Sequence, residues 1–141
     1  MPTLVHDPAR IDHVANQVLV TIAVRNNRLT VFPQRGTEVV VYFRVDPAQG
    51  NPAAPGEVRW VVDGLGEQQS VVIAAKEPDN RNHFSKTQYT IKYPNNTVCS
   101  GPPKRSPYPN GSFVWPYRVT LFQGTRELDV FDPDVEIRDV P

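Results

Sequence analysis

Residues 113–121 read Phe-Val-Trp-Pro-Tyr-Arg-Val-Thr-Leu, and this stretch decides the fold. Every second residue, from Phe113 to Leu121, is aromatic or aliphatic. Successive side chains of a β-strand point to opposite faces, so this spacing puts all the large residues on one face of one strand. The stretch therefore predicts a long strand with one face in a hydrophobic core.

The same alternation recurs upstream and downstream of this stretch. Residues 17–25 place Val18, Val20, Ile22 and Val24 on one face, and 57–62 do the same with Val58, Trp60 and Val62. Further strands are expected at 29–32, 38–45, 70–75, 88–93, 127–131 and 135–138. Asn26-Asn27 predicts a hairpin, and Asp132-Pro133-Asp134 predicts a further turn. The sum is an all-β chain of about eight or nine strands.

The length and composition indicate one domain. The chain has 141 residues, and most of its 15 prolines fall between the apolar runs. Residues 1–16 lack sustained periodicity and are interpreted as an N-terminal arm with room for a helical turn at 8–15. Residues 17–141 are expected to form a single β-sandwich domain.

Three features resemble the immunoglobulin-like β-sandwich: a valine-rich strand at 37–45, Trp60, and Tyr117-Arg118-Val119-Thr120-Leu121. The resemblance implies an antiparallel sandwich with Trp60 in the core and a Tyr117 hydroxyl bonded back to upstream backbone. The paired cysteines of antibody domains are replaced by apolar residues such as Val41 and Val119. A cupredoxin-like sandwich is the near alternative, but no histidine follows Cys99, so its copper ligands are missing.

Charge and motif content argue against several classes of function. Lys plus Arg and Asp plus Glu number 15 each, so no net field favours nucleic acid. No apolar run approaches the ~18 residues of a membrane span, and the N-terminus lacks a signal-peptide pattern, so a cytoplasmic location is expected. We find no catalytic or nucleotide-binding motif. The sequence therefore predicts a non-enzymatic protein without a cofactor.

Long loops are the expected site of function, because binding residues concentrate on loops held by a rigid scaffold. The segments 46–56, 76–87 and 100–112 exceed the usual loop length of about 4–6 residues. Within them we expect His83, Lys104, Arg105 and Tyr108 to contact a protein partner. A binding or assembly module is the first hypothesis.

Two alternatives remain open. Apolar residues on the outer faces of the expected strands favour self-association, as a homodimer formed through a sheet face or edge. These residues are Leu19, Val40, Tyr42, Val61 and Phe122. An acidic cluster that includes Asp129, Asp132 and Asp134 is a weak candidate for calcium, although an Asx turn and solvent-side positions explain it more simply.

Overall fold

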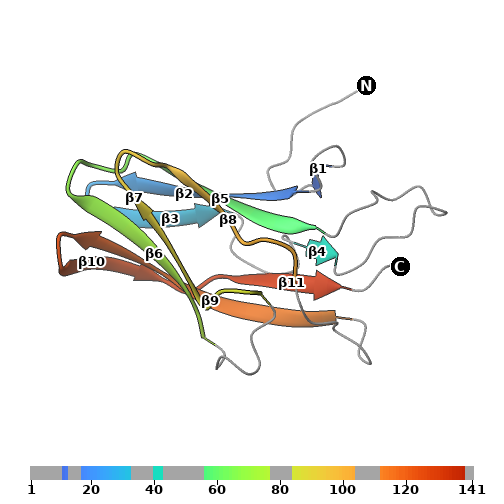
Figure 1. Ribbon diagram of the computed structural model, residues 1–141. Helices are drawn as coiled ribbons and strands as arrows, with labels where there is room; N and C mark the ends of the chain where they lie inside the picture. Colours follow the sequence, from blue (N-terminus) through green and yellow to red (C-terminus); the bar gives the residue numbers. More distant parts are fainter. Residues whose placement is uncertain are drawn as a thin grey trace.

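The computed structural model describes residues 11–12, 17–32, 40–42, 56–76, 84–103 and 112–138. Within these residues the regular structure consists of strands alone, arranged in two sheets (Figure 1). The side chains between the sheets form one hydrophobic core. The expected all-β sandwich is confirmed as an architecture of two mostly antiparallel sheets.

The first sheet has five strands, with β2 near its centre. β2 pairs in parallel with β5, while β1 and β3 share its opposite edge, and β8 completes the sheet beyond β5. The strands are β1 (Ile11–Asp12), β2 (Gln17–Arg25), β3 (Arg28–Phe32), β5 (Glu57–Asp63) and β8 (Thr97–Cys99).

The second sheet has six strands built around the long strand that the sequence predicts. β9 pairs with β6 on one side and with both β10 and β11 on the other, while β7 and β4 form the outer strands. The strands are β4 (Val40–Tyr42), β6 (Gln69–Ala75), β7 (Gln88–Lys92), β9 (Ser112–Gln123), β10 (Arg126–Phe131) and β11 (Asp134–Arg138).

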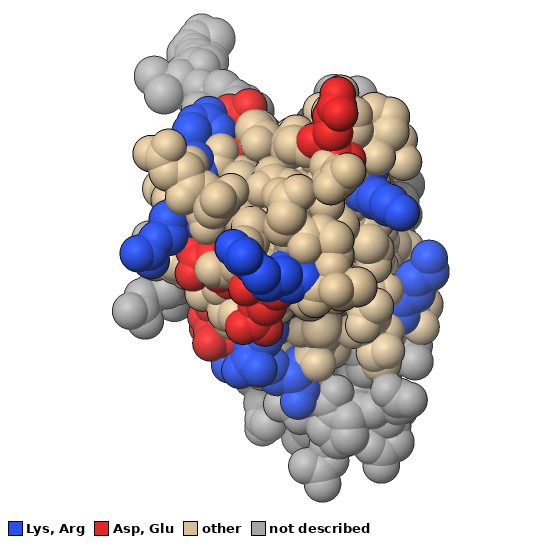
Figure 2. All heavy atoms as spheres, turned by 90° about the vertical axis from the view of Figure 1, so that its left-hand side faces the viewer, with Lys and Arg blue, Asp and Glu red and all other residues tan. Residues whose placement is uncertain are grey.

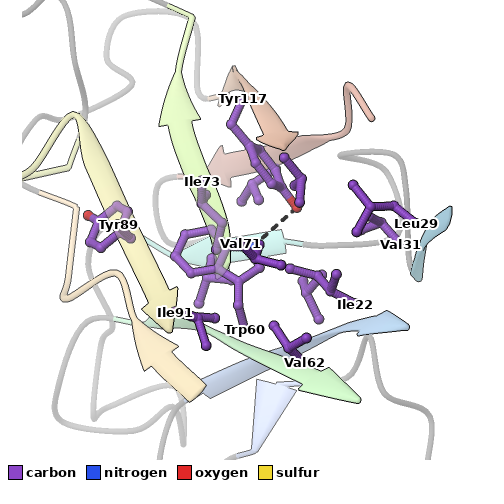
Figure 3. Packing of buried hydrophobic residues seen from close by; sticks show 14 of the residues in the cluster. Ile22, Leu29, Val31, Trp60, Val62, Val71, Ile73, Tyr89, Ile91 and Tyr117 are labelled. Carbon is purple, nitrogen blue, oxygen red and sulfur yellow. Dashed lines mark hydrogen bonds between the residues drawn. The ribbon is translucent and has the colours of Figure 1, made fainter. Parts of the chain in front are cut away.

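The predicted inward faces form the core (Figure 3). Strand β2 buries its alternate valines and isoleucine, β5 buries Trp60 between two valines, and β9 buries every second residue from Trp115 to Leu121. The Asn26-Asn27 turn is also confirmed, since both residues have positive φ, as a type I′ hairpin requires. Removing this apolar surface from water is the main stabilising term of such a fold.

The prediction of a turn at Asp132-Pro133-Asp134 is wrong. β10 and β11 run in the same direction along β9, and the register continues from Phe131↔Val119 to Asp134↔Pro116. Pro133 has no N–H to give to the ladder, but its carbonyl accepts a hydrogen bond from Tyr117 N at 3.1 Å. The chain therefore passes straight through the proline.

Several other expectations change. Strand pairing is not purely antiparallel, because β2 with β5 and β4 with β11 are parallel. The strand expected at 88–93 ends one residue earlier, because Tyr93 lies in a turn and is 43% exposed. Within the N-terminal arm, Ile11–Asp12 pairs with β2 as a strand rather than forming part of a helical turn. Of the strand expected at 38–45, the described part is β4.

The two residues that carry the immunoglobulin-like resemblance do meet, but differently from that expectation. Trp60 is in the core, and its indole Nε1–H donates to the Tyr117 hydroxyl oxygen at 3.3 Å (Figure 3). The resemblance implied a bond from that hydroxyl to upstream backbone. The structure thus shows a two-sheet sandwich, but not the tyrosine-to-backbone bond that the immunoglobulin-like resemblance implied.

Candidate functional site

Five aromatic side chains lie together between the sheets: Trp60, Phe84, Tyr89, Trp115 and Tyr117, here called the aromatic cluster. Trp60 lies 5.3 Å from Tyr89 and 5.6 Å from Tyr117 between ring centroids. Phe84 packs edge-on against Trp115 at 4.8 Å. Tilted and edge-to-face contacts of this kind add stabilisation beyond the buried area. The cluster ties β5, β7 and β9 to the segment before β7.

The tyrosines of the aromatic cluster are held neutral. Burial raises the pKa of Tyr117 well above its usual value, against the opposing effect of the Trp60 hydrogen bond, and Asp134 raises it further. Burial also raises the pKa of Tyr89 to about 12, although a backbone hydrogen bond with Lys86 opposes the shift. Neither hydroxyl is therefore prepared to act as a base near neutral pH. Their arrangement is suited to holding neighbouring segments in place.

Tyr89 and Ser100 fix the start of the segment that follows β8. The Tyr89 hydroxyl donates to the Ser100 carbonyl oxygen at 2.9 Å, and Val58 N donates to Ser100 Oγ at 2.9 Å. Ser100 N in turn donates to the Val58 carbonyl oxygen at 2.8 Å. Ser100 is 2% exposed, so these bonds are shielded from water. The chain leaves the sandwich here from a fixed position.

The long connections emerge from one half of the sandwich. β4 ends and β9 begins at the same level, because Tyr42 and Ser112 both pair with Arg138. In the other sheet, β5 begins near the level where β8 ends. We call the end of the sandwich where β4 and β8 end and β5 and β9 begin the loop end; it lies to the right in Figure 1. β6 ends opposite Tyr117, partway along β9, so the connection to β7 leaves from this same half.

The predicted contact residues His83, Lys104, Arg105 and Tyr108 lie outside the described residues. Two of them are next to buried residues that are described: His83 directly precedes Phe84, and Lys104 directly follows Pro103. Phe84 is fully buried beside Trp115, and Pro103 is also buried. Phe84 was missed by sequence reasoning; its signal was a lone phenylalanine within the polar stretch 76–87.

The opposite end of the sandwich closes in short turns and is called the turn end. Its turns are Asn26-Asn27, 64–68, 93–96 and Gly124-Thr125. They bond to one another, as Gln69 Nε2 donates to Asn27 Oδ1 at 3.1 Å and Gly124 N donates to the Gln68 carbonyl oxygen at 2.9 Å. Figure 2 faces this end and shows basic and acidic side chains interspersed. No region of a single sign marks it for a charged ligand.

Of the three aspartates considered for calcium, Asp129 and Asp132 bond to groups of the protein, and Asp134 lies at the start of β11. Asp129 accepts hydrogen bonds from Leu29 N at 2.8 Å and from Val130 N at 3.0 Å. Asp132 bonds to Arg118 Nε at 3.0 Å and lies 3.4 Å from Lys76 Nζ, and the Arg118 bond above all lowers the pKa of its carboxyl. Among the described residues no three His, Cys, Asp or Glu side chains gather as a metal-binding group.

The remaining sequence candidates are placed as follows. Among the residues named for self-association, three are half-buried on the outer faces of the sheets: Leu19, Val61 and Phe122. The side chains of the other two, Val40 and Tyr42, are not among those that the structure describes. Cys99 is half-buried at the end of β8. None of the described segments forms a helix with the length and hydropathy that a membrane crossing requires.

Comparison with known proteins gives no relative for this chain. No protein-family model, no curated protein and no solved structure matches it.

Proposed function

We propose that this protein is a non-enzymatic binding module that presents its long loops to a protein partner. The observation that supports it is the asymmetry of the sandwich. The long connections leave from the loop end and the adjoining half, whereas the opposite end closes in short turns. These connections exceed the usual length of about 4–6 residues, and long connections in compact domains are often functional.

The aromatic cluster supplies the rigid base that such a module needs. Phe84 and Tyr89 hold the segment before β7, and Ser100 holds the segment after β8. Fixing the ends of a loop lowers the entropy that is lost when the loop binds. Side chains next to these fixed positions, His83 and Lys104 among them, are the proposed contact residues together with Arg105 and Tyr108.

The test compares two quadruple variants in quantitative affinity enrichment followed by titration of the recovered partner. The loop variant changes His83, Lys104, Arg105 and Tyr108 to alanine. The control variant changes four residues at the turn end to alanine, all of them exposed: Arg28, Gln123, Thr125 and Arg126. Like the loop variant, it removes two positive charges. Melting curves establish that both variants remain folded.

We expect the loop variant to lose partner affinity by roughly tenfold or more, as happens when a few contact residues dominate an interface. The control variant should bind as the wild type does. Equal binding by the wild type and the loop variant would contradict the proposal, and so would a loss confined to the control.

A further inference from the structure

The edge strands of the two sheets differ in how they are protected from pairing with another chain. An exposed strand edge carries unpaired N–H and C=O groups, and proteins usually block such edges with bulges, charges, prolines or short strands. On β3, the outward Leu29 N–H is capped by the Asp129 carboxylate. β10 carries a register shift between Glu127 and Asp129. β8 and β4 are only 3 residues long, and β1 is 2.

β7 has none of these protections among the described residues. It runs for 5 residues, Gln88–Lys92, without a register shift or a proline. Its only charged residue is Lys92, at the end of the strand. It pairs with β6 on one side and forms the margin of the six-stranded sheet on the other. Within the described chain, β7 is thus the longest regular edge left without a blocking feature.

The hydrogen bonds flanking β7 show which of its backbone groups point outward. Ala75 N donates to the Thr87 carbonyl oxygen at 2.8 Å, and Tyr93 N donates to the Gln69 carbonyl oxygen at 3.4 Å. In an antiparallel pair, hydrogen-bonded and non-hydrogen-bonded positions alternate. The backbone groups of Tyr89 and Ile91 therefore face β6, and those of Gln88, Thr90 and Lys92 face away from it. All three outward residues are also exposed at their side chains.

We propose that β7 pairs antiparallel with β7 of a second copy of this chain, about a two-fold axis at Thr90. Thr90 N–H then donates to the Thr90 carbonyl oxygen of the other copy, and the Thr90 carbonyl oxygen accepts from the Thr90 N–H of that copy. Lys92 N–H donates to the Gln88 carbonyl oxygen of the other copy. This register sets threonine opposite threonine and each lysine opposite a neutral glutamine, so no like charges meet. The formal net charge of zero gives two copies no overall repulsion.

This pairing goes beyond the proposed binding function and is independent of it, because β7 contains none of the proposed loop contacts. It gives the self-association alternative a defined strand and register. Two six-stranded sheets would join into one continuous sheet, as in other cases of β-strand addition. The area buried by one strand pair is small, so the association is expected to be weak and concentration-dependent.

Sedimentation equilibrium on the full chain over a range of concentrations tests the pairing. Thr90→Lys and Thr90→Glu each place like charges at the two-fold axis while leaving the β6–β7 bonds in place. Each should weaken self-association by roughly tenfold or more, and an equal mixture of the two should associate again. Thr30→Lys is the control, because Thr30 is an exposed threonine on a different edge strand, β3.

Wild-type self-association, its loss in both Thr90 variants, its recovery in the mixture and its retention in Thr30→Lys would together support the pairing. A wild type that stays monomeric at every concentration would overturn it, and so would association that both Thr90 variants retain. Since the loop variant leaves β7 unchanged, failure of either proposal can be told from failure of the other.

Discussion

At the scale of single residues, the hydrogen bond between Trp60 and Tyr117 joins the two sheets inside the core. Both side chains are fully buried, so the bond is shielded from bulk solvent. Tyr117→Phe removes the acceptor and leaves that N–H unsatisfied, which should lower the free energy of unfolding by about 1–3 kcal/mol near pH 7. Urea denaturation measures this loss.

The pH dependence of stability gives the same residue a second readout. Below pH 10, the ordinary pKa of a tyrosine, Tyr117 is protonated in both states; above it, the unfolded chain loses a proton that the folded chain keeps. Stability is therefore intact below pH 10 and falls as the pH rises further, by about 1.4 kcal/mol per pH unit for this group. Tyr89 adds the same slope until its native pKa of about 12.

Tyr117→Phe should reduce this alkaline slope, so its deficit relative to the wild type narrows as the pH rises from 10 toward 12. Tyr93→Phe is the control for the loss of a tyrosine hydroxyl at pH 7, since Tyr93 is 43% exposed, and it should lower the free energy of unfolding far less than Tyr117→Phe does. A deficit of the same size at pH 7 and at the alkaline limit would be inconsistent with a buried neutral Tyr117.

At the scale of strands, Asp129 holds two edges together. Its carboxylate on β10 accepts from the outward Leu29 N–H of β3 at 2.8 Å, in a partly buried position. Asp129→Ala should lower the free energy of unfolding by about 1.5–3 kcal/mol, because a hydrogen bond to a charged acceptor is lost and the N–H is left unpaired. Asp129→Asn keeps an acceptor oxygen and should lose less.

Asp63→Ala is the control for Asp129→Ala, because it removes a carboxylate that is exposed. Asp63 pairs with Arg25 at 2.6 Å, but the two side chains are 65% and 61% exposed, so the loss should stay within about 1 kcal/mol. If Asp129→Ala were no more costly than Asp63→Ala in urea denaturation, the carboxylate could not be closing this edge.

The strands themselves were largely predictable, because alternation reveals which face is buried. Alternation alone assigns Trp60 and Val119 to inward faces, and both are fully buried. Alternation does not name the neighbouring strand, so the parallel pairing of β2 with β5 was not foreseen. Three-residue β8 carries too short a pattern to detect. Pro133 suggested a turn because its missing N–H is visible in sequence, whereas its bonded carbonyl is not.

The candidate site was less predictable for a related reason. Loop length and composition nominated His83, Lys104, Arg105 and Tyr108, and these residues stay predictions. What sequence could not supply was the packing that fixes the loop ends. Phe84 has no alternating neighbours, and the bond from Tyr89 to Ser100 depends on which strands lie across from each other.

At the scale of the whole molecule, hydrogen bonds cross between the sheets at the centre and at both edges. Trp60 bonds to Tyr117 in the core, Leu29 to Asp129 at one edge, and Tyr89 to Ser100 at the other. Neither sheet can open without exposing the other's core face and breaking these bonds. We therefore expect one cooperative unfolding transition for the whole sandwich, as is usual for domains of this size.

Tryptophan fluorescence can follow the unfolding of each sheet separately, since Trp60 lies on β5 of the first sheet and Trp115 on β9 of the second. Trp115→Phe leaves a reporter in the first sheet, and Trp60→Phe leaves one in the second. For each variant, the urea midpoint from tryptophan fluorescence should equal the midpoint from far-ultraviolet circular dichroism. Both variants should be less stable than the wild type, because each loses buried aromatic contacts. A fluorescence midpoint that precedes the dichroism midpoint in one variant alone would mean that this sheet unfolds separately, and that the inter-sheet bonds do not couple the two halves.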